Sequence, residues 1–569
     1  MGVPSLFRTI AERYPDVHYW DPSLHVDHLY IDYNCLLHHC KSKLQIAPGT
    51  SSGDVDEELV AEAIRYTSYI ITEVVKPRKL VYIAIDGPVP MGKLVRQRAR
   101  RYKKVQDDAF RKKLCAKHNV ETSAGFDGNK ITPGTAFMMK LSARLKSFAL
   151  LGSFSKHITK QTKRFNVLIS DASIPGEGEQ KIVDFMRNGK HGASVVVYGL
   201  DADLIVLSML LDRGIKLLRE PQNSPIEMSA YHDSPFLYLD IERCTHRLLK
   251  EYNLECYNRE KVVLDFVLLS FFGGNDFVDA FVHTKMRDGG LTTFMAAYSK
   301  TLKETQRHLV TDTGVPCVHT LTNILNRVAE TEDHAMKRLQ KRWAGSGSAK
   351  RRPEKTATPQ ELIDYEMQLY EHSLYCERSN PFHVRYKDAF HSICFQDPHS
   401  AWKAQYNGFY FDHKRESEVC DDYLKCIAWT MKYYTENCPS WLWAYPHRNA
   451  PLCSSLAQHL TSMKQNELNE IWNGCVLDDK PLEPLEQLVA VLPPQCSSLL
   501  PFSYSKIVED IFPKSIVLDA AKGLKNIYSE PLLPPIDYKL IYKLVSCVPV
   551  NEKEAARNET HSRAFCVKF

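Results

Sequence analysis

The sequence lacks the features by which membrane and secreted proteins are recognised. No apolar run approaches the length of a membrane span, and residues 1–15 (MGVPSLFRTIAERYP) contain no signal-peptide core. The 16 cysteines form no CxxC pair, which argues against a zinc ribbon and indicates reduced thiols. We therefore expect a soluble intracellular protein without a membrane partner, in the cytoplasm rather than the nucleus.

The chain also lacks a strong excess of charge. Its 73 Lys and Arg nearly balance its 68 Asp and Glu, so local clusters must decide whether it binds nucleic acid. Its 569 residues exceed the size of one ordinary core, and the basic, proline-containing stretch 345–359 (GSGSAKRRPEKTATP) is typical of a linker. We predict a first domain at 1–344 and a second, aromatic-rich region at 360–569.

Short apolar runs alternate with helical patterns between residues 28 and 220. The runs LYI, KLVYIAI, FNVLIS and SVVVY predict buried strands, and GIKLL could add a fifth. This alternation predicts an α/β fold with a mainly parallel central sheet covered by helices on both faces. Segments 484–501 and 530–543 are expected to pack back onto this domain.

Acidic residues follow the ends of these strands and of one buried helix. Carboxyl ends of parallel strands meet at one edge of a sheet, where ligands gather. Carboxylates that lie together repel unless a cation neutralises them, and hard divalent ions prefer such oxygens. Because two acidic pairs each follow a strand, we favour a metal site over a solvated loop for Asp32, Asp86, Glu177, Glu179, Asp201 and Asp203, with Asp276 as a possible addition.

Two further acidic residues are interpreted differently. Asp171 also ends a strand, but we expect it to cap the turn before Pro175 rather than bind a metal. Asp265 lies inside an apolar helix, where it could support the site from behind or cap a helix.

A basic helix follows Asp86. Its cationic face is ordinarily interpreted as solvated, but its start near a strand-end carboxylate suits a phosphate pocket. The side chains recur at helical spacing and comprise Lys93, Gln97, Arg100, Arg101 and Lys104.

Aromatic residues gather between positions 429 and 445. Trp429, Tyr433 and Tyr434 have the spacing of a helix core. Trp441 and Trp443 follow a proline in a loop-like setting, where they could stack on unpaired bases, although core packing is the commoner role.

These motifs, in this order, closely resemble the Xrn-type 5′→3′ exoribonucleases along almost the whole chain. The first conserved region is matched by MGVP…RYP, YIDYNCLLH, AIDGPVPMGK…QRARRYK, ITPGTAFM, LISDASIPGEGEQKI, VYGLDADLI and FFGGNDF. The second is matched by AWTMKYYTENCPSWLWAYPHRNAP, LVAVLPP and PLLPPIDYKLI. The resemblance implies a PIN/5′-nuclease-like catalytic domain at 1–344 and a mostly helical second region that completes the pocket.

The resemblance assigns roles to individual residues. It implies that two Mg²⁺ or Mn²⁺ ions are bound by all seven acidic residues, which are retained here: Asp32, Asp86, Glu177, Glu179, Asp201, Asp203 and Asp276. The 5′-monophosphate pocket falls on Lys93, Gln97, Arg100 and Arg101. His38 is implied to stack on the first base, opposite Trp441 or Trp443, which the sequence does not separate.

The implied activity is processive degradation of single-stranded RNA with a 5′-monophosphate to nucleoside 5′-monophosphates. No protein partner is implied directly, although an upstream decapping activity would produce such ends. Two departures stand out: VDAFVHT follows GGNDF where the family has Leu-Pro-His, and the chain ends soon after PLLPPIDYKLI, as expected for a minimal version. The alternatives are a structure-specific flap-type 5′ nuclease, whose helix-hairpin motif is missing after Asp276, and a non-catalytic RNA-binding scaffold.

Overall fold

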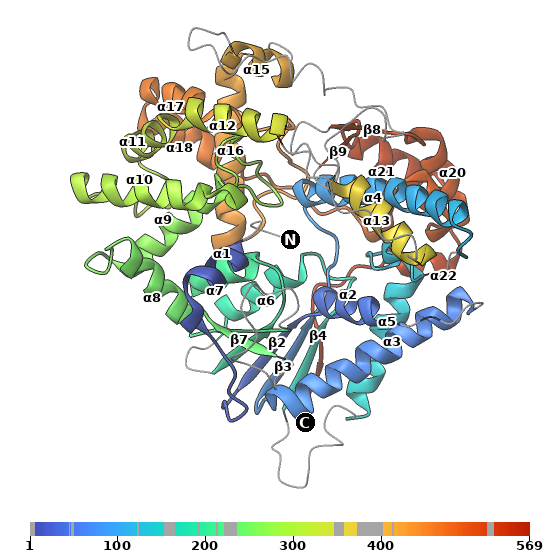
Figure 1. Cartoon of the computed structure of the whole chain (residues 1–569). Helices are drawn as coiled ribbons and strands as arrows, with labels where there is room; N and C mark the ends of the chain where they lie inside the picture. Colours follow the sequence, from blue (N-terminus) through green and yellow to red (C-terminus); the bar gives the residue numbers. More distant parts are fainter. Residues whose placement is uncertain are drawn as a thin grey trace.

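The computed structural model describes most of the chain (Figure 1): residues 6–44, 46, 50–121, 125–152, 165–189, 194–211, 214–220, 236–345, 358–372, 402–411, 415–519 and 529–568. Most of the predicted linker at 345–359 lies outside these residues, so the predicted domain division stays a prediction. None of the helices in the described ranges is long and apolar enough to cross a membrane.

Five parallel strands form the centre of an eight-stranded sheet, in the spatial order β6-β5-β2-β3-β4. Each coincides with a predicted apolar run, so the mainly parallel α/β fold is confirmed. The strands are β2 (His28–Asp32), β3 (Leu80–Ala84), β4 (Asn166–Ser170), β5 (Val195–Tyr198) and β6 (Lys216–Arg219).

Three antiparallel strands, which were not predicted, extend the sheet at both edges. On one side β7 (Leu237–Asp240) pairs with β6, and the two-residue β1 (His18–Tyr19) pairs with β7. On the other side β10 (Phe565–Val567) pairs with β4, with Phe565 opposite Ile169. The sheet therefore joins segments from both ends of the described chain.

Both faces of the sheet are covered, as predicted (Figure 1). Alternate residues of each strand point to opposite faces, so that Leu29 and Ile31 belong to one core while Tyr30 belongs to the other. One face is packed against α2 (Tyr33–Lys43), α3 (Ser52–Tyr69) and α5 (Ala136–Leu150). The other is packed against α1 (Leu6–Arg13), α6 (Gly178–Arg187), α7 (Asp203–Leu211), α8 (Ile241–Glu251) and α9 (Arg259–Phe271).

A mostly helical region packs on top of this α/β unit. The core of α16 (Glu416–Thr435) is continuous with that of α6 to α9, and Trp429, Tyr433 and Tyr434 are buried in it, as predicted. The other helices are α10 (Gly290–Thr305), α11 (Val318–Ala329), α12 (Glu332–Gly345), α13 (Pro359–His372), α15 (Trp402–Phe411), α17 (Cys453–Ser462), α18 (Gln465–Asn473), α20 (Phe502–Ile511) and α22 (Glu552–Ala555).

The long helix α4 (Met91–Lys117) lies among C-terminal elements (Figure 1). A third core joins it to α19 (Pro484–Val491) and α21 (Tyr538–Cys547), which confirms that segments 484–501 and 530–543 pack back on the first region. The short strands β8 (Val517–Asp519) and β9 (Glu530–Leu532) form a separate ribbon beside it. Chain segments several hundred residues apart thus fix the position of α4.

Candidate active site

Acidic side chains from four strand ends and from the loop after α9 come together at the carboxyl edge of the sheet. The chain passes from β2 to β3 and β4 on one side, then returns to β5 and β6 on the other. Such a reversal opens a crevice at the strand ends, where ligands of open α/β sheets bind. Electrostatic interactions connect all seven predicted ligands: Asp32, Asp86, Glu177, Glu179, Asp201, Asp203 and Asp276.

Gly178 allows the start of α6 to approach this edge closely. Its N–H donates to Oδ1 of Asp86 at 2.7 Å. A Cβ at this position would lie 3.0 Å from the carbonyl oxygen of Ala84 and 3.1 Å from Oδ1 of Asp32, closer than side chains normally pack. The Gly-flanked acidic turn therefore places its two glutamates against the carboxylates that follow the central strands.

A buried lysine on α4 neutralises part of the cluster. Lys93 is 7% exposed and forms ion pairs with Glu177 and, at 2.7 Å, with Asp276. Burial opposes the charge on Lys93, but Asp276 and Glu177 outweigh burial and raise the lysine pKa. Burial likewise opposes the charge on Asp276. The positive charges of Lys93 and Arg100 outweigh burial and lower the pKa of Asp276. The structure thus places Lys93 among the carboxylates.

At Asp32, Asp203 and Glu179, burial and neighbouring carboxylates outweigh any nearby positive charge and raise the carboxyl pKa. Burial and two neighbouring carboxylates raise the pKa of Asp32 to about 7, and burial together with Asp276 raises the pKa of Asp203 to about 7. Glu179 is 8% exposed, and within the described chain its Oε2 has no hydrogen-bond partner. A hard divalent cation would supply both the missing charge and the missing contact. The donor set therefore fits such ions.

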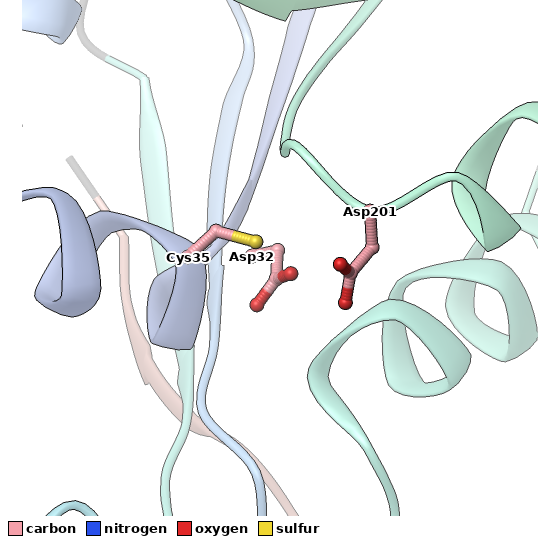
Figure 2. A group of neighbouring side chains, drawn as sticks. All are labelled: Asp32, Cys35 and Asp201. Carbon is pink, nitrogen blue, oxygen red and sulfur yellow. The ribbon is translucent and has the colours of Figure 1, made fainter. Parts of the chain in front are cut away.

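Figure 2 shows an unexpected neighbour of this cluster, Cys35, whose thiol lies beside the carboxylates of Asp32 and Asp201. One ligand atom from each of the three residues lies within 4.8 Å of the others. Burial, followed by the two carboxylates, raises the pKa of the Cys35 thiol, so that it is neutral without metal. Cys35 was not among the predicted site residues, although its place three residues after a strand-end aspartate was a signal.

The predicted phosphate-binding residues share one face of α4, beside the acidic cluster. Arg100 lies 3.7 Å from Asp276. Burial, and then the like charge of Arg100, lower the pKa of Arg101 to about 10. Among the residues that the structure describes, Nη1 of Arg101 and Oε1 of Gln97 are buried without hydrogen-bond partners. A buried guanidinium with free donors is suited to an anion.

The two candidate tryptophans have different surroundings. Trp443 packs against the main core, and its ring lies 5.3 Å from Nζ of Lys425. The backbone N–H of Trp441 donates to Asp479 at 2.6 Å, and its carbonyl accepts from the N–H of Met91 at 2.8 Å, at the start of α4. Trp441 is therefore tied to the helix that carries the phosphate-binding residues.

His38, the other predicted base-stacking residue, is exposed on α2. Its charged neighbours are Lys41, Asp86, Asp201 and Arg101. The ring is thus near enough to interact with the acidic cluster and with Arg101 of α4.

Several supporting residues were missed. Tyr433, predicted only as core, donates its hydroxyl to Oε1 of Glu177 at 3.0 Å, and its own carbonyl accepts from Gln180 at 2.7 Å. Asp479 accepts from the Ser440 hydroxyl at 2.6 Å as well as from the Trp441 backbone. No local sequence pattern marks either role, because each depends on contacts between distant segments.

For Asp171 and Asp265, which were not assigned to the metal site, one prediction is confirmed and the other is not. Asp171 accepts from the backbone of Ser173 at 3.1 Å and so caps its turn, as predicted. Both roles considered for Asp265 are wrong. It accepts from the Tyr298 hydroxyl at 2.6 Å and from the N–H groups of Leu309 and Val310 at 3.0 and 2.7 Å, so it anchors a distant loop.

Comparison with known proteins bears directly on this geometry. A domain model described as the XRN 5′-3′ exonuclease N-terminus matches residues 1–221. A second, described as the Xrn1 helical domain, matches residues 256–387 and 399–568. The chain belongs to the Xrn family. The first match contains six of the seven predicted metal-binding carboxylates, and the second contains Asp276 and the loop with Trp441 and Trp443.

Curated relatives carry the same family name. The chain is 26% identical to a human protein named 5′-3′ exoribonuclease 1, over 99% of the chain and 35% of the relative. It is also 26% identical to a Drosophila melanogaster 5′-3′ exoribonuclease 2 homolog (95% of the chain, 70% of the relative) and to Schizosaccharomyces pombe 5′-3′ exoribonuclease 1 (99% and 50%). The chain thus spans between 35% and 70% of the length of these relatives.

Proposed function

We propose that this protein is a processive 5′→3′ exoribonuclease that degrades single-stranded RNA bearing a 5′-monophosphate to nucleoside 5′-monophosphates. The observation that carries the proposal is the cluster of seven carboxylates, four of them buried, next to Arg101, whose buried Nη1 has no hydrogen-bond partner within the described chain. Membership of the Xrn family and relatives named 5′-3′ exoribonuclease support it.

The carboxylates would hold two Mg²⁺ or Mn²⁺ ions. When bound, such ions lower the barrier of phosphodiester hydrolysis by activating water for in-line attack and by stabilising the leaving 3′-oxygen. The protein contributes the geometry. Gly178 holds α6 against Asp86, and the Tyr433 hydroxyl orients Glu177, so that the ligands are held in place before substrate arrives.

The basic face of α4 would select the 5′ end. Arg101 and Gln97 offer buried, unpartnered polar atoms, and Arg100 adds a partly exposed guanidinium. The oxygens of a monophosphate would accept from the guanidinium groups of Arg101 and Arg100, while a triphosphate or a cap would bring more charge and bulk than a pocket closed around one phosphate can accept.

An aromatic clamp would hold the first bases. His38 lies on the α2 side of the cluster, and Trp441 lies at the start of α4. Base stacking contributes about 1–3 kcal/mol per base and tolerates any sequence. We assign the clamp to His38 and Trp441, because Trp441 is bonded to the start of α4 whereas the partly buried Trp443 packs against the main core.

One RNA with three different 5′ ends tests the proposal. A single-stranded RNA labelled at its 3′ end and carrying a monophosphate, triphosphate or hydroxyl is incubated with the protein and Mg²⁺. We expect selective loss of the monophosphate substrate with mononucleotide products. Equal cleavage of all three, or internal fragments, would refute the phosphate pocket and favour a flap-type endonuclease.

A ligand variant separates catalysis from binding. Asp201→Ala combined with Asp203→Ala should abolish cleavage and retain RNA binding, because it removes metal ligands and leaves α4 intact. Full-rate hydrolysis by this variant would overturn the assignment of the acidic cluster. Absence of hydrolysis by the wild type with either ion would favour the RNA-binding scaffold.

A further inference from the structure

The thiol of Cys35 introduces a soft donor into an otherwise all-oxygen site. Asp32 is the last residue of β2 and the N-cap of α2, Cys35 lies in the first turn of that helix, and Asp201 follows β5. Their ligand atoms lie within 4.8 Å of one another (Figure 2). Within the part of the chain that the structure describes, this is the one mixed cysteine–carboxylate group so close together.

The local fold fixes this arrangement. Oδ1 of Asp32 accepts from the N–H of Asn34 at 3.2 Å, which locks the carboxylate over the start of α2. Residues three positions apart at a helix start lie on the same side. The Cys35 side chain therefore comes back over the Asp32 carboxylate, and β5 brings Asp201 to it from the neighbouring strand.

A second observation concerns a buried carboxylate that interacts with Asp201. Glu179, which is 8% exposed, keeps one oxygen without a hydrogen-bond partner within the described chain, and Asp201 is among its electrostatic neighbours. Buried oxygens are seldom left unsatisfied. Glu179 thus offers a further oxygen to a positive ion near Asp201.

The ligand chemistry separates two classes of ion. Mg²⁺ takes oxygen ligands and gains little from sulfur. Zn²⁺ and Cd²⁺ bind thiolate together with carboxylates, and Zn²⁺ commonly uses three protein ligands and one water. The same pocket therefore offers a thiophilic ion one strong ligand that Mg²⁺ does not use.

We propose that Asp32, Cys35 and Asp201 form an inhibitory site for a thiophilic divalent ion, Zn²⁺ or Cd²⁺, that overlaps the Mg²⁺ position. The ion binds the Cys35 sulfur, and the thiol proton passes to the solvent as the metal–sulfur bond forms. It holds two carboxylates that catalysis requires and so stops the nuclease. The inhibition rests on the proposed function, whereas the metal binding does not.

Cadmium spectroscopy tests the binding without any activity measurement. The full-length, chelator-treated protein is titrated with Cd²⁺ while the ultraviolet charge-transfer band of the cadmium–thiolate bond is recorded. In Cys35→Ser, the increase in absorbance that occurs at the lowest Cd²⁺ concentrations should be lost. Cys256→Ser, which alters an exposed cysteine, should keep it. Wild-type melting behaviour of Cys35→Ser shows that the fold is intact, and Cys35→Ala is the second variant if it is not. An unchanged band in the folded variant overturns the proposal.

Inhibition of RNA cleavage tests the consequence. At fixed Mg²⁺, the Zn²⁺ concentration for half inhibition should rise at least about tenfold in Cys35→Ser relative to Cys256→Ser, because a ligand is lost. An equal Zn²⁺ response in both variants refutes the inhibitory role. A protein that shows the Cys35-dependent band but no cleavage under any condition would refute the nuclease assignment and leave the metal site standing.

Discussion

Replacing Lys93 by an uncharged residue tests how much its positive charge stabilises the folded protein by neutralising the acidic cluster. Lys93→Met keeps a long side chain and deletes the ion pairs with Glu177 and Asp276. Removing one partner of a buried ion pair costs about 3–5 kcal/mol. If all 569 residues unfold together, an entropy of about 2.1 cal/mol/K per residue gives about 1.2 kcal/mol/K, so Tm should fall by about 3–4 °C.

Differential scanning calorimetry in chelator and in Mg²⁺ is the suitable assay. Lys113→Met is the matched control, because Lys113 is exposed on the same helix. Mg²⁺ should reduce the difference in Tm between Lys93→Met and wild type, since a bound ion replaces the missing charge and stabilises the folded state by mass action. A folded Lys93→Met protein that melts at the wild-type temperature in chelator would refute the reasoning and indicate that protons, rather than Lys93, balance the carboxylates.

Other side chains have distinct expected effects. Arg101→Met should lower kcat/KM for 5′-monophosphorylated RNA about 10–150-fold and leave the slow residual cleavage of 5′-hydroxyl RNA unchanged, since a charged hydrogen bond contributes about 1.5–3 kcal/mol; an equal proportional loss of both rates would contradict the pocket. Tyr433→Phe should raise the half-saturating Mg²⁺ concentration in cleavage assays about 10–100-fold through loss of support for Glu177, and an unchanged Mg²⁺ dependence would rule that support out. Trp441→Ala should weaken RNA binding about 5–150-fold by fluorescence anisotropy, whereas Trp443→Ala should mainly lower Tm; the reverse pattern would exchange their roles.

The central sheet and the acidic edge were predictable because they depend on local patterns. Each parallel strand is a run of apolar residues bounded by polar ones, and each acidic ligand follows such a run or a buried helix. The antiparallel edges were not predictable. The two residues of β1 and the three of β10 carry no periodicity, and only pairing with β7 and β4 makes them strands.

The least predictable features are those that join distant segments. The cationic pattern of α4 correctly places Lys93 on the face of α4 near the acidic edge, but the ion pairs that bury it depend on the loops before α6 and after α9. The partners of Asp265 could not be predicted for the same reason, because the first of them in the sequence, Tyr298, lies 33 residues later. The spacing of Tyr433 correctly predicted that its ring is buried in the helix core. It gave no indication that its hydroxyl donates to Glu177.

Glu177 and the segment before α4 are hydrogen-bonded to residues of the C-terminal half of the chain. This has a consequence for the order in which the site forms as the protein is synthesised. The seven carboxylates leave the ribosome well before their supports: Tyr433 donates to Glu177, and the side chain of Gln487 accepts from the N–H of Val89 just ahead of α4. At about 5–20 residues per second, the roughly 200 residues between the last carboxylate and Gln487 take about 10–40 s to appear. A nascent chain therefore holds an incomplete pocket while it remains beside the messenger RNA that encodes it.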